Sequence, residues 1–219
     1  TWSTTISQLS KNPEFKQTRL VALDLLGFGK SLHANWLDYD YHDYNQALAN
    51  TIKKLKITTP IVLVGHSMGA LIAAEYVNAN SSSAKHQIIR LILVSPPVLM
   101  PDELARLPDQ VYIKSYSSLH RLAADVPAME VVAKIVQRFS SFRSDYIKTA
   151  AFAKSMEQVI LNHQNFATFT KIHVPTLLLH GHFDPLVMGS NLRLAAKRNP
   201  TYLRYQSVIG HHDISVGKR

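Results

Sequence analysis

The chain has 219 residues, with 24 Lys and Arg against 15 Asp and Glu, a formal net charge of +9, and no cysteine. This length fits one domain with an insertion better than two independent large domains. The lack of cysteine excludes disulfide scaffolds, zinc–thiolate sites and thiol catalysis. The basic residues form no Lys/Arg stripe interleaved with aromatic residues, so we expect a solvated surface and no nucleic-acid partner.

The first ten residues, TWSTTISQLS, carry neither the basic nor the apolar region of a secretory signal. No apolar run reaches the roughly 18 residues that a membrane-spanning helix needs. We therefore expect a cytoplasmic protein without a membrane span. These patterns make no prediction of the oligomeric state.

Short apolar runs followed by turn residues predict buried strands at Leu20 to Leu25, Ile61 to Val64, Ile88 to Val94 and Thr176 to Leu179. Runs without polar alternation are typical of strands covered on both faces, as in a parallel sheet. Helical patterns, such as Tyr44 to Lys54 and Met68 to Asn78, lie between them. Strand and helix in alternation predict an α/β fold with a doubly wound, mostly parallel sheet.

The alternation stops between Pro96 and Val174. Amphipathic patterns there, Met129 to Phe139 and Ser144 to Asn162, indicate helices without a convincing strand. Such an insertion between two sheet strands is best interpreted as a cap over one edge of the sheet. We therefore expect a core formed by residues 1–97 and 174–219 and a helical cap at residues 98–173.

The segment Gly65-His66-Ser67-Met68-Gly69 follows one predicted strand and opens a predicted helix. This context is what a G-x-S-x-G nucleophile elbow requires. Because a Cβ at position 65 or 69 would collide with the strand or the helix, glycine is expected at both. The pattern predicts that Ser67 is a nucleophile.

A serine hydroxyl is a weak nucleophile near neutral pH, so a base and an orienting acid are expected downstream. Asp184 lies just past the predicted strand that ends in TLLLH. His211 follows the strand-like run Tyr202 to Ile209, directly after Gly210. Both positions belong to the sheet edge that carries Ser67, where open α/β sheets bind their ligands.

These motifs resemble those of the α/β-hydrolase fold superfamily, and the resemblance covers nearly the whole chain. Asp24-Leu25-Leu26-Gly27-Phe28-Gly29-Lys30-Ser31 is similar to the turn that precedes the nucleophile in these enzymes, and GHSMG, HGHFDPLV and GHHD are similar to the segments bearing nucleophile, acid and histidine. The resemblance implies Ser67 as nucleophile, His211 as general base and Asp184 as its orienting partner. It also implies that the Met68 backbone N–H is one oxyanion-hole donor.

The family's second oxyanion donor comes from a loop after an early strand, which this sequence does not contain. We expect that donor upstream of Thr1 in the parent protein. Losing one such donor typically costs about 10²–10³ in rate.

The base and the acid each have alternatives. His212 adjoins His211, and because one of the two can face Ser67, the family pattern favours His211. Asp213, Asp102 and Asp40 are other possible acids, which we interpret as solvated loop carboxylates.

A zinc site is the competing chemistry. His180, His182 and Asp184 have the H-x-H-x-D spacing that holds zinc in some hydrolases. The next histidine of that motif is replaced by Pro185, and zinc would leave the serine elbow unexplained. We interpret His66, His182 and His212 as pocket or supporting residues and His180 similarly.

The sequence therefore predicts a serine hydrolase that works through an acyl-enzyme and needs no metal or organic cofactor. A carboxylesterase acting on small or medium apolar esters is the commonest expectation. A lipase, a carbon–carbon bond hydrolase and a perhydrolase of the same fold remain open. So does a ligand-binding receptor that keeps the triad without turnover.

Overall fold

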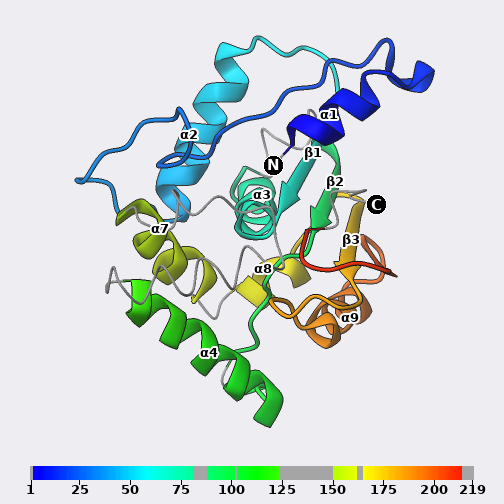
Figure 1. Cartoon of the computed structure of the whole chain (residues 1–219). Helices are drawn as coiled ribbons and strands as arrows, with labels where there is room; N and C mark the ends of the chain where they lie inside the picture. Colours follow the sequence, from blue (N-terminus) through cyan, green and yellow to red (C-terminus); the bar gives the residue numbers. More distant parts are fainter. Residues whose placement is uncertain (1, 81–87, 102, 124–149, 162–164, 214–219) are drawn as a thin grey trace.

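A computed structural model of the chain describes residues 2–80, 88–101, 103–123, 150–161 and 165–213 (Figure 1). The elements in chain order are α1 (Ser3–Leu9), the 3-10 helix η1 (Pro13–Phe15), α2 (Tyr41–Lys54), β1 (Ile61–His66), α3 (Met68–Ala79), β2 (Ile88–Val94), α4 (Leu107–Ala123), α7 (Ala150–Ser155), the π-helix η2 (Met156–Ile160), α8 (Asn165–Thr170), β3 (Thr176–Gly181), α9 (Gly189–Arg198) and β4 (Leu203–Val208).

The four strands form one parallel sheet in the order β1-β2-β3-β4. Parallel pairing means that all four strands end at the same edge of the sheet. His66 of β1 is paired with Val94 of β2, and Gly181 of β3 with Val208 of β4, so the loops after these strands start side by side. The predicted parallel sheet and three of its predicted strands are confirmed.

The core lies between the sheet and the helices that cover it. Helix α3 packs against β1, β2, α2 and α8, and α9 packs against β4 and α8. Because α3 has neighbours on most sides, it is apolar almost all round, and Figure 1 shows it end-on at the centre of the molecule. The side chains that are almost fully buried include Leu71, Ile72, Leu91, Leu93, Phe169 and Leu178.

The predicted strand at Leu20 to Leu25 is wrong. This segment runs without regular secondary structure. Its Val21 and Leu23 are 43% and 40% exposed, and on β1 the side chains of Val62 and Val64 are exposed to a similar degree. An apolar pattern favours extended backbone, but a strand also needs a neighbour that completes its hydrogen-bond ladder. Within the described residues, β1 is the edge of the sheet.

The described residues between β2 and β3 form helices and loops, as predicted for Pro96 to Val174. The helix predicted at Met129 to Phe139 lies outside the described residues, and α7 with η2 occupies part of the predicted Ser144 to Asn162. The short α8 packs on α3 and α9. The division into core and cap stays a prediction.

Two tyrosines of α2 connect the first half of the chain to α7 and η2. The Tyr44 hydroxyl is 2.7 Å from the Ser155 hydroxyl, and the Tyr41 hydroxyl donates to the Val159 carbonyl at 3.0 Å.

No helix of the described residues has the length and apolar character needed to cross a membrane.

Candidate active site

Ser67 occupies a sharp turn between β1 and α3. Its backbone has φ 54° and ψ −125°, a conformation that L-residues rarely adopt, and its N–H donates to the Val94 carbonyl at 2.8 Å. Strand β1 ends at His66, and α3 begins at Met68. The local structure is therefore the strand–turn–helix that the G-x-S-x-G motif predicts.

The two glycines of the motif have different roles. A Cβ at Gly65 would lie 2.5 Å from the Gly69 carbonyl oxygen and 2.6 Å from Ala70 Cα, both backbone atoms that cannot rotate away. A Cβ at Gly69 would meet Leu25 Cδ1 at 3.9 Å, an ordinary contact. The expected collision is thus found at Gly65, where the helix backbone of Gly69 and Ala70 passes close to the strand, and it is absent at Gly69.

Met68 is the first residue of α3, so its N–H is one of the amide groups that an α-helix leaves without an intrahelical partner. The same helix end carries a partial positive charge, which favours negative charge nearby. An oxygen that becomes negative next to this helix end would be stabilised by the free N–H and by the partial positive charge. The role of the Met68 N–H as an oxyanion donor stays a prediction.

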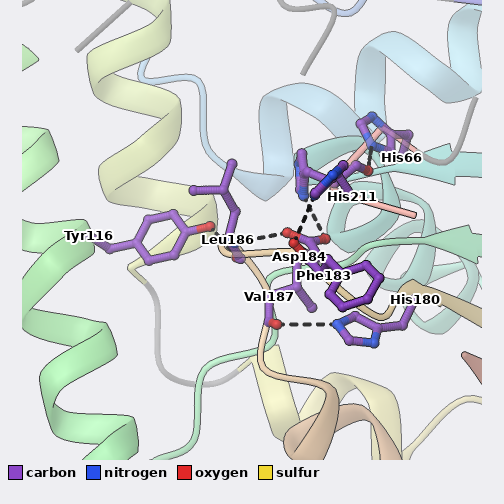
Figure 2. A network of polar contacts seen from close by, with 9 residues as sticks. His66, Tyr116, His180, Phe183, Asp184, Leu186, Val187 and His211 are labelled. Carbon is purple, nitrogen blue, oxygen red and sulfur yellow. Dashed lines mark hydrogen bonds and ion pairs between the residues drawn. The ribbon is translucent and has the colours of Figure 1, made fainter. Parts of the chain in front are cut away.

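Asp184 lies in the turn after β3 and is held by its own loop. Its backbone N–H donates to the Gly181 carbonyl at 3.0 Å, and its Oδ1 accepts from the Leu186 N–H at 2.8 Å. The side chain is inaccessible to solvent. Its second oxygen, Oδ2, is turned toward the loop after β4 (Figure 2).

His212, not His211, meets this carboxylate. His212 Nδ1 donates to Asp184 Oδ2 at 2.9 Å, and the His212 side chain is 5% exposed. His211 is exposed, and its Nδ1 donates to the Phe183 carbonyl at 3.1 Å. The predicted pairing of Asp184 with His211 is therefore corrected to His212. The backbone bends at His212, whose ring turns inward while that of His211 stays at the surface.

His66 connects the elbow to this pair. Its Nε2 donates to the His212 backbone carbonyl at 2.9 Å, and the two rings lie 4.9 Å apart at 53°. Burial, and then the nearby His212, lower the pKa of His66, which favours the neutral ring. The expected supporting role of His66 thus has a defined contact.

His180 and His182 do not converge with Asp184. His180 is buried, its Nε2 donates to the Val187 carbonyl at 3.3 Å, and its Nδ1 accepts from the Tyr205 hydroxyl at 3.3 Å. His182 is exposed and packs edge-on against Phe183. Within the described residues, no group of three or more His, Asp or Glu side chains is arranged to hold a metal ion.

Tyr116 of α4 contacts the turn that carries Asp184, and the sequence did not predict it as a site residue. Its hydroxyl donates to the Leu186 carbonyl at 2.7 Å, and Figure 2 shows the ring pointing from α4 toward the Asp184 turn. The hydroxyl of Tyr112, one helical turn earlier, is also buried, and the two tyrosine rings pack edge-on at 5.2 Å. Burial raises the pKa of both phenols. The i, i+4 spacing of two tyrosines is a sequence signal, but it does not identify their partner.

A family model described as serine aminopeptidase, S33, matches residues 3–207. No curated protein sequence matches the chain.

Solved structures share the fold at low sequence identity. An esterase from Exiguobacterium antarcticum has a TM-score of 0.72 and 19% identity, over 97% of this chain and 81% of its own. An enol-lactonase from Burkholderia xenovorans LB400 has a TM-score of 0.70 and 19% identity, over 98% and 80%. A bromoperoxidase from Bacillus anthracis has a TM-score of 0.65 and 20% identity, over 88% and 74%.

Proposed function

Because the chain belongs to the serine aminopeptidase S33 family and has the α/β-hydrolase fold, we propose that it is a serine hydrolase with Ser67 as nucleophile, His212 as general base and Asp184 as the orienting acid. The observation that carries the proposal is the buried Asp184–His212 pair, which contacts the residue preceding a strained Ser67.

The proposed reaction begins when Ser67 Oγ attacks the substrate carbonyl. Asp184 accepts a hydrogen bond from the Nδ1–H of His212, so Nε2 is the ring nitrogen that takes the serine proton. The carboxylate stabilises the imidazolium without becoming protonated. The Met68 N–H stabilises the oxygen that becomes negative.

The tetrahedral intermediate collapses when the carbon–oxygen bond to the alcohol breaks and His212 returns its proton to the leaving oxygen. The acyl group stays on Ser67. His212 then takes a proton from water, the hydroxide attacks the acyl carbon, and Ser67 leaves with that proton. The products are one alcohol and one carboxylic acid, and the protein is regenerated without a cofactor.

We propose carboxylic esters of small or medium size as the substrate class. An esterase and an enol-lactonase are among the proteins with similar structures, and both names refer to ester bonds. We further propose that residues 98–173 act as a cap whose helix α4 reaches the acid turn through Tyr116. The family description names an aminopeptidase, so an amide substrate is the candidate to test against the ester.

The decisive experiment is labelling with a fluorophosphonate probe, followed by steady-state assays. Wild type should be labelled and Ser67→Ala should not, whereas equal labelling of both removes the nucleophile assignment. Continuous turnover of p-nitrophenyl acetate or butyrate would support an enzyme, and a single slow turnover would indicate a receptor. Faster turnover of an aminoacyl p-nitroanilide than of either ester would replace the ester proposal.

A further inference from the structure

The His212 segment is held mainly against the loop that carries the acid. The Phe183 N–H donates to the Gly210 carbonyl at 2.9 Å, the His211 ring donates to the Phe183 carbonyl, and the His212 ring donates to Asp184. All these partners follow β3. They fix the histidine relative to the acid, but the proposed nucleophile follows a different strand, β1, which lies two strands away from β3 in the sheet.

His66 provides a contact to the strand of the nucleophile. It is the last residue of β1 and directly precedes Ser67 in the chain. Its Nε2–H donates to the His212 backbone carbonyl at 2.9 Å, and the two rings, tilted at 53°, add a second contact between the same residues. Because Ser67 directly follows His66 in the chain, the His66 side chain connects the His212 backbone to the nucleophile.

We propose that His66 is a positioning residue that sets the separation of the His212 ring from Ser67 by holding the His212 backbone carbonyl. This inference rests on the proposed function, because it assigns His212 as the base. His66 itself acts through His212 and has no assigned contact with substrate.

A neutral imidazole suits this role. Donation from Nε2 to a carbonyl fixes the proton on that nitrogen, so the neutral ring can keep the contact throughout the reaction. A positively charged His66 at this distance from His212 would oppose the imidazolium that forms during attack. Burial lowers the pKa of His66, which favours the uncharged ring near neutral pH.

Loss of this contact should slow the chemistry without changing substrate affinity. Displacement of a catalytic group by about 1 Å can cost roughly 10²-fold in rate. We expect His66→Leu, which has no donor, to reduce kcat and the rate constant of fluorophosphonate labelling by about 10- to 100-fold, with KM changed by less than about twofold. His66→Gln keeps an amide N–H at a similar reach and should stay within about fivefold of wild type.

The experiment compares these variants with His42→Leu, a matched control at an exposed histidine of α2. Thermal unfolding is measured for each variant, and His66→Met supplies a second side chain without a donor should His66→Leu not fold. Slow labelling of the donor-free variant together with rescue by glutamine supports the proposal. Labelling of a folded donor-free variant at the wild-type rate, or equal slowing of it and His66→Gln, overturns it.

The two proposals fail in different ways. If wild type and Ser67→Ala are labelled alike, the proposed function is wrong whatever the His66 variants do. If Ser67→Ala alone is inert while every His66 variant behaves as wild type, the proposed function stands and the positioning role of His66 is refuted.

Discussion

His212 Nδ1 lies 2.9 Å from Asp184 Oδ2, and the two side chains are only 5% and 0% exposed. A hydrogen bond between a ring and a carboxylate in a region with so little water is far stronger than one at the surface. The preceding residue, His211, is exposed, and its ring contacts the Phe183 backbone carbonyl instead. The structure thus pairs Asp184 with His212, although the sequence pattern favours His211.

Substitution of the two histidines should separate their roles. His212→Gln should lower kcat/KM for p-nitrophenyl butyrate by at least about 10³-fold, because the serine loses its base. His211→Gln should remain within about threefold, because glutamine can still donate to the Phe183 carbonyl. A large loss in His211→Gln with an active His212→Gln would restore His211 as the base.

The glycines of the elbow give a prediction about folding. Gly65→Ala places a methyl group 2.5 Å from the Gly69 carbonyl oxygen, so the elbow must open or the protein must fail to fold. Gly69→Ala meets one side chain at 3.9 Å and gains up to about 1 kcal/mol of helix propensity. We expect a thermal midpoint lower by several degrees or an insoluble product for the first, and an unchanged or higher midpoint for the second. Equal midpoints would contradict the asymmetry.

Sequence reasoning succeeded where one local pattern is sufficient. The runs that became β1, β2 and β3 are apolar and end in turn residues, and the G-x-S-x-G motif carries its own strand and helix. The prediction failed at Leu20 to Leu25. An apolar run of this kind favours extended backbone whether or not it joins a sheet, and it becomes a strand only when a neighbouring strand pairs with it.

The histidine partner of Asp184 was predicted wrongly for a related reason. Which of His211 and His212 turns inward depends on the backbone path after β4 and on its hydrogen bonds to the Asp184 loop, and these join residues 27 or 28 positions apart in the chain. Tyr116 reaches Leu186 across 70 positions. Contacts of this kind have no periodicity or spacing that a single sequence could reveal.

The two tyrosines of α4 predict effects of different size for the same substitution. Tyr116→Phe removes the donor to the Leu186 carbonyl and should lower the free energy of unfolding by about 1–3 kcal/mol. Tyr112→Phe removes a buried hydroxyl whose polar neighbour is Tyr116 and should lower this free energy less, because the bond to Leu186 is kept. Urea unfolding of both variants and wild type checks this.

The same pair also reports on the Asp184 turn. Because the Leu186 N–H donates to Asp184, loosening of Leu186 in Tyr116→Phe should also reduce kcat, by about 3- to 30-fold. Loss of stability in Tyr112→Phe equal to that in Tyr116→Phe would show that the hydroxyl bond to Leu186 is not what stabilises this region.

His180 predicts how stability depends on pH. Burial lowers the pKa of His180 below its ordinary value of 6.5, with smaller effects from nearby His182 and Arg193 in the same direction and from Asp184 against it. Well above pH 6.5 the ring is neutral in both folded and unfolded chains and contributes nothing to the pH dependence. As the pH falls below that value, the unfolded chain binds a proton that the folded protein refuses, so the free energy of unfolding decreases.

His180→Gln should remove this contribution while keeping a donor for the Val187 carbonyl and an acceptor for the Tyr205 hydroxyl. Urea unfolding between about pH 5 and about pH 8 should show a smaller loss of stability at the acid end than in wild type, by at most about 1.4 kcal/mol per pH unit. His182→Gln, at an exposed position, should follow the wild-type curve. Parallel curves for wild type and His180→Gln would mean that His180 takes up its proton as readily in the folded protein as in the unfolded chain.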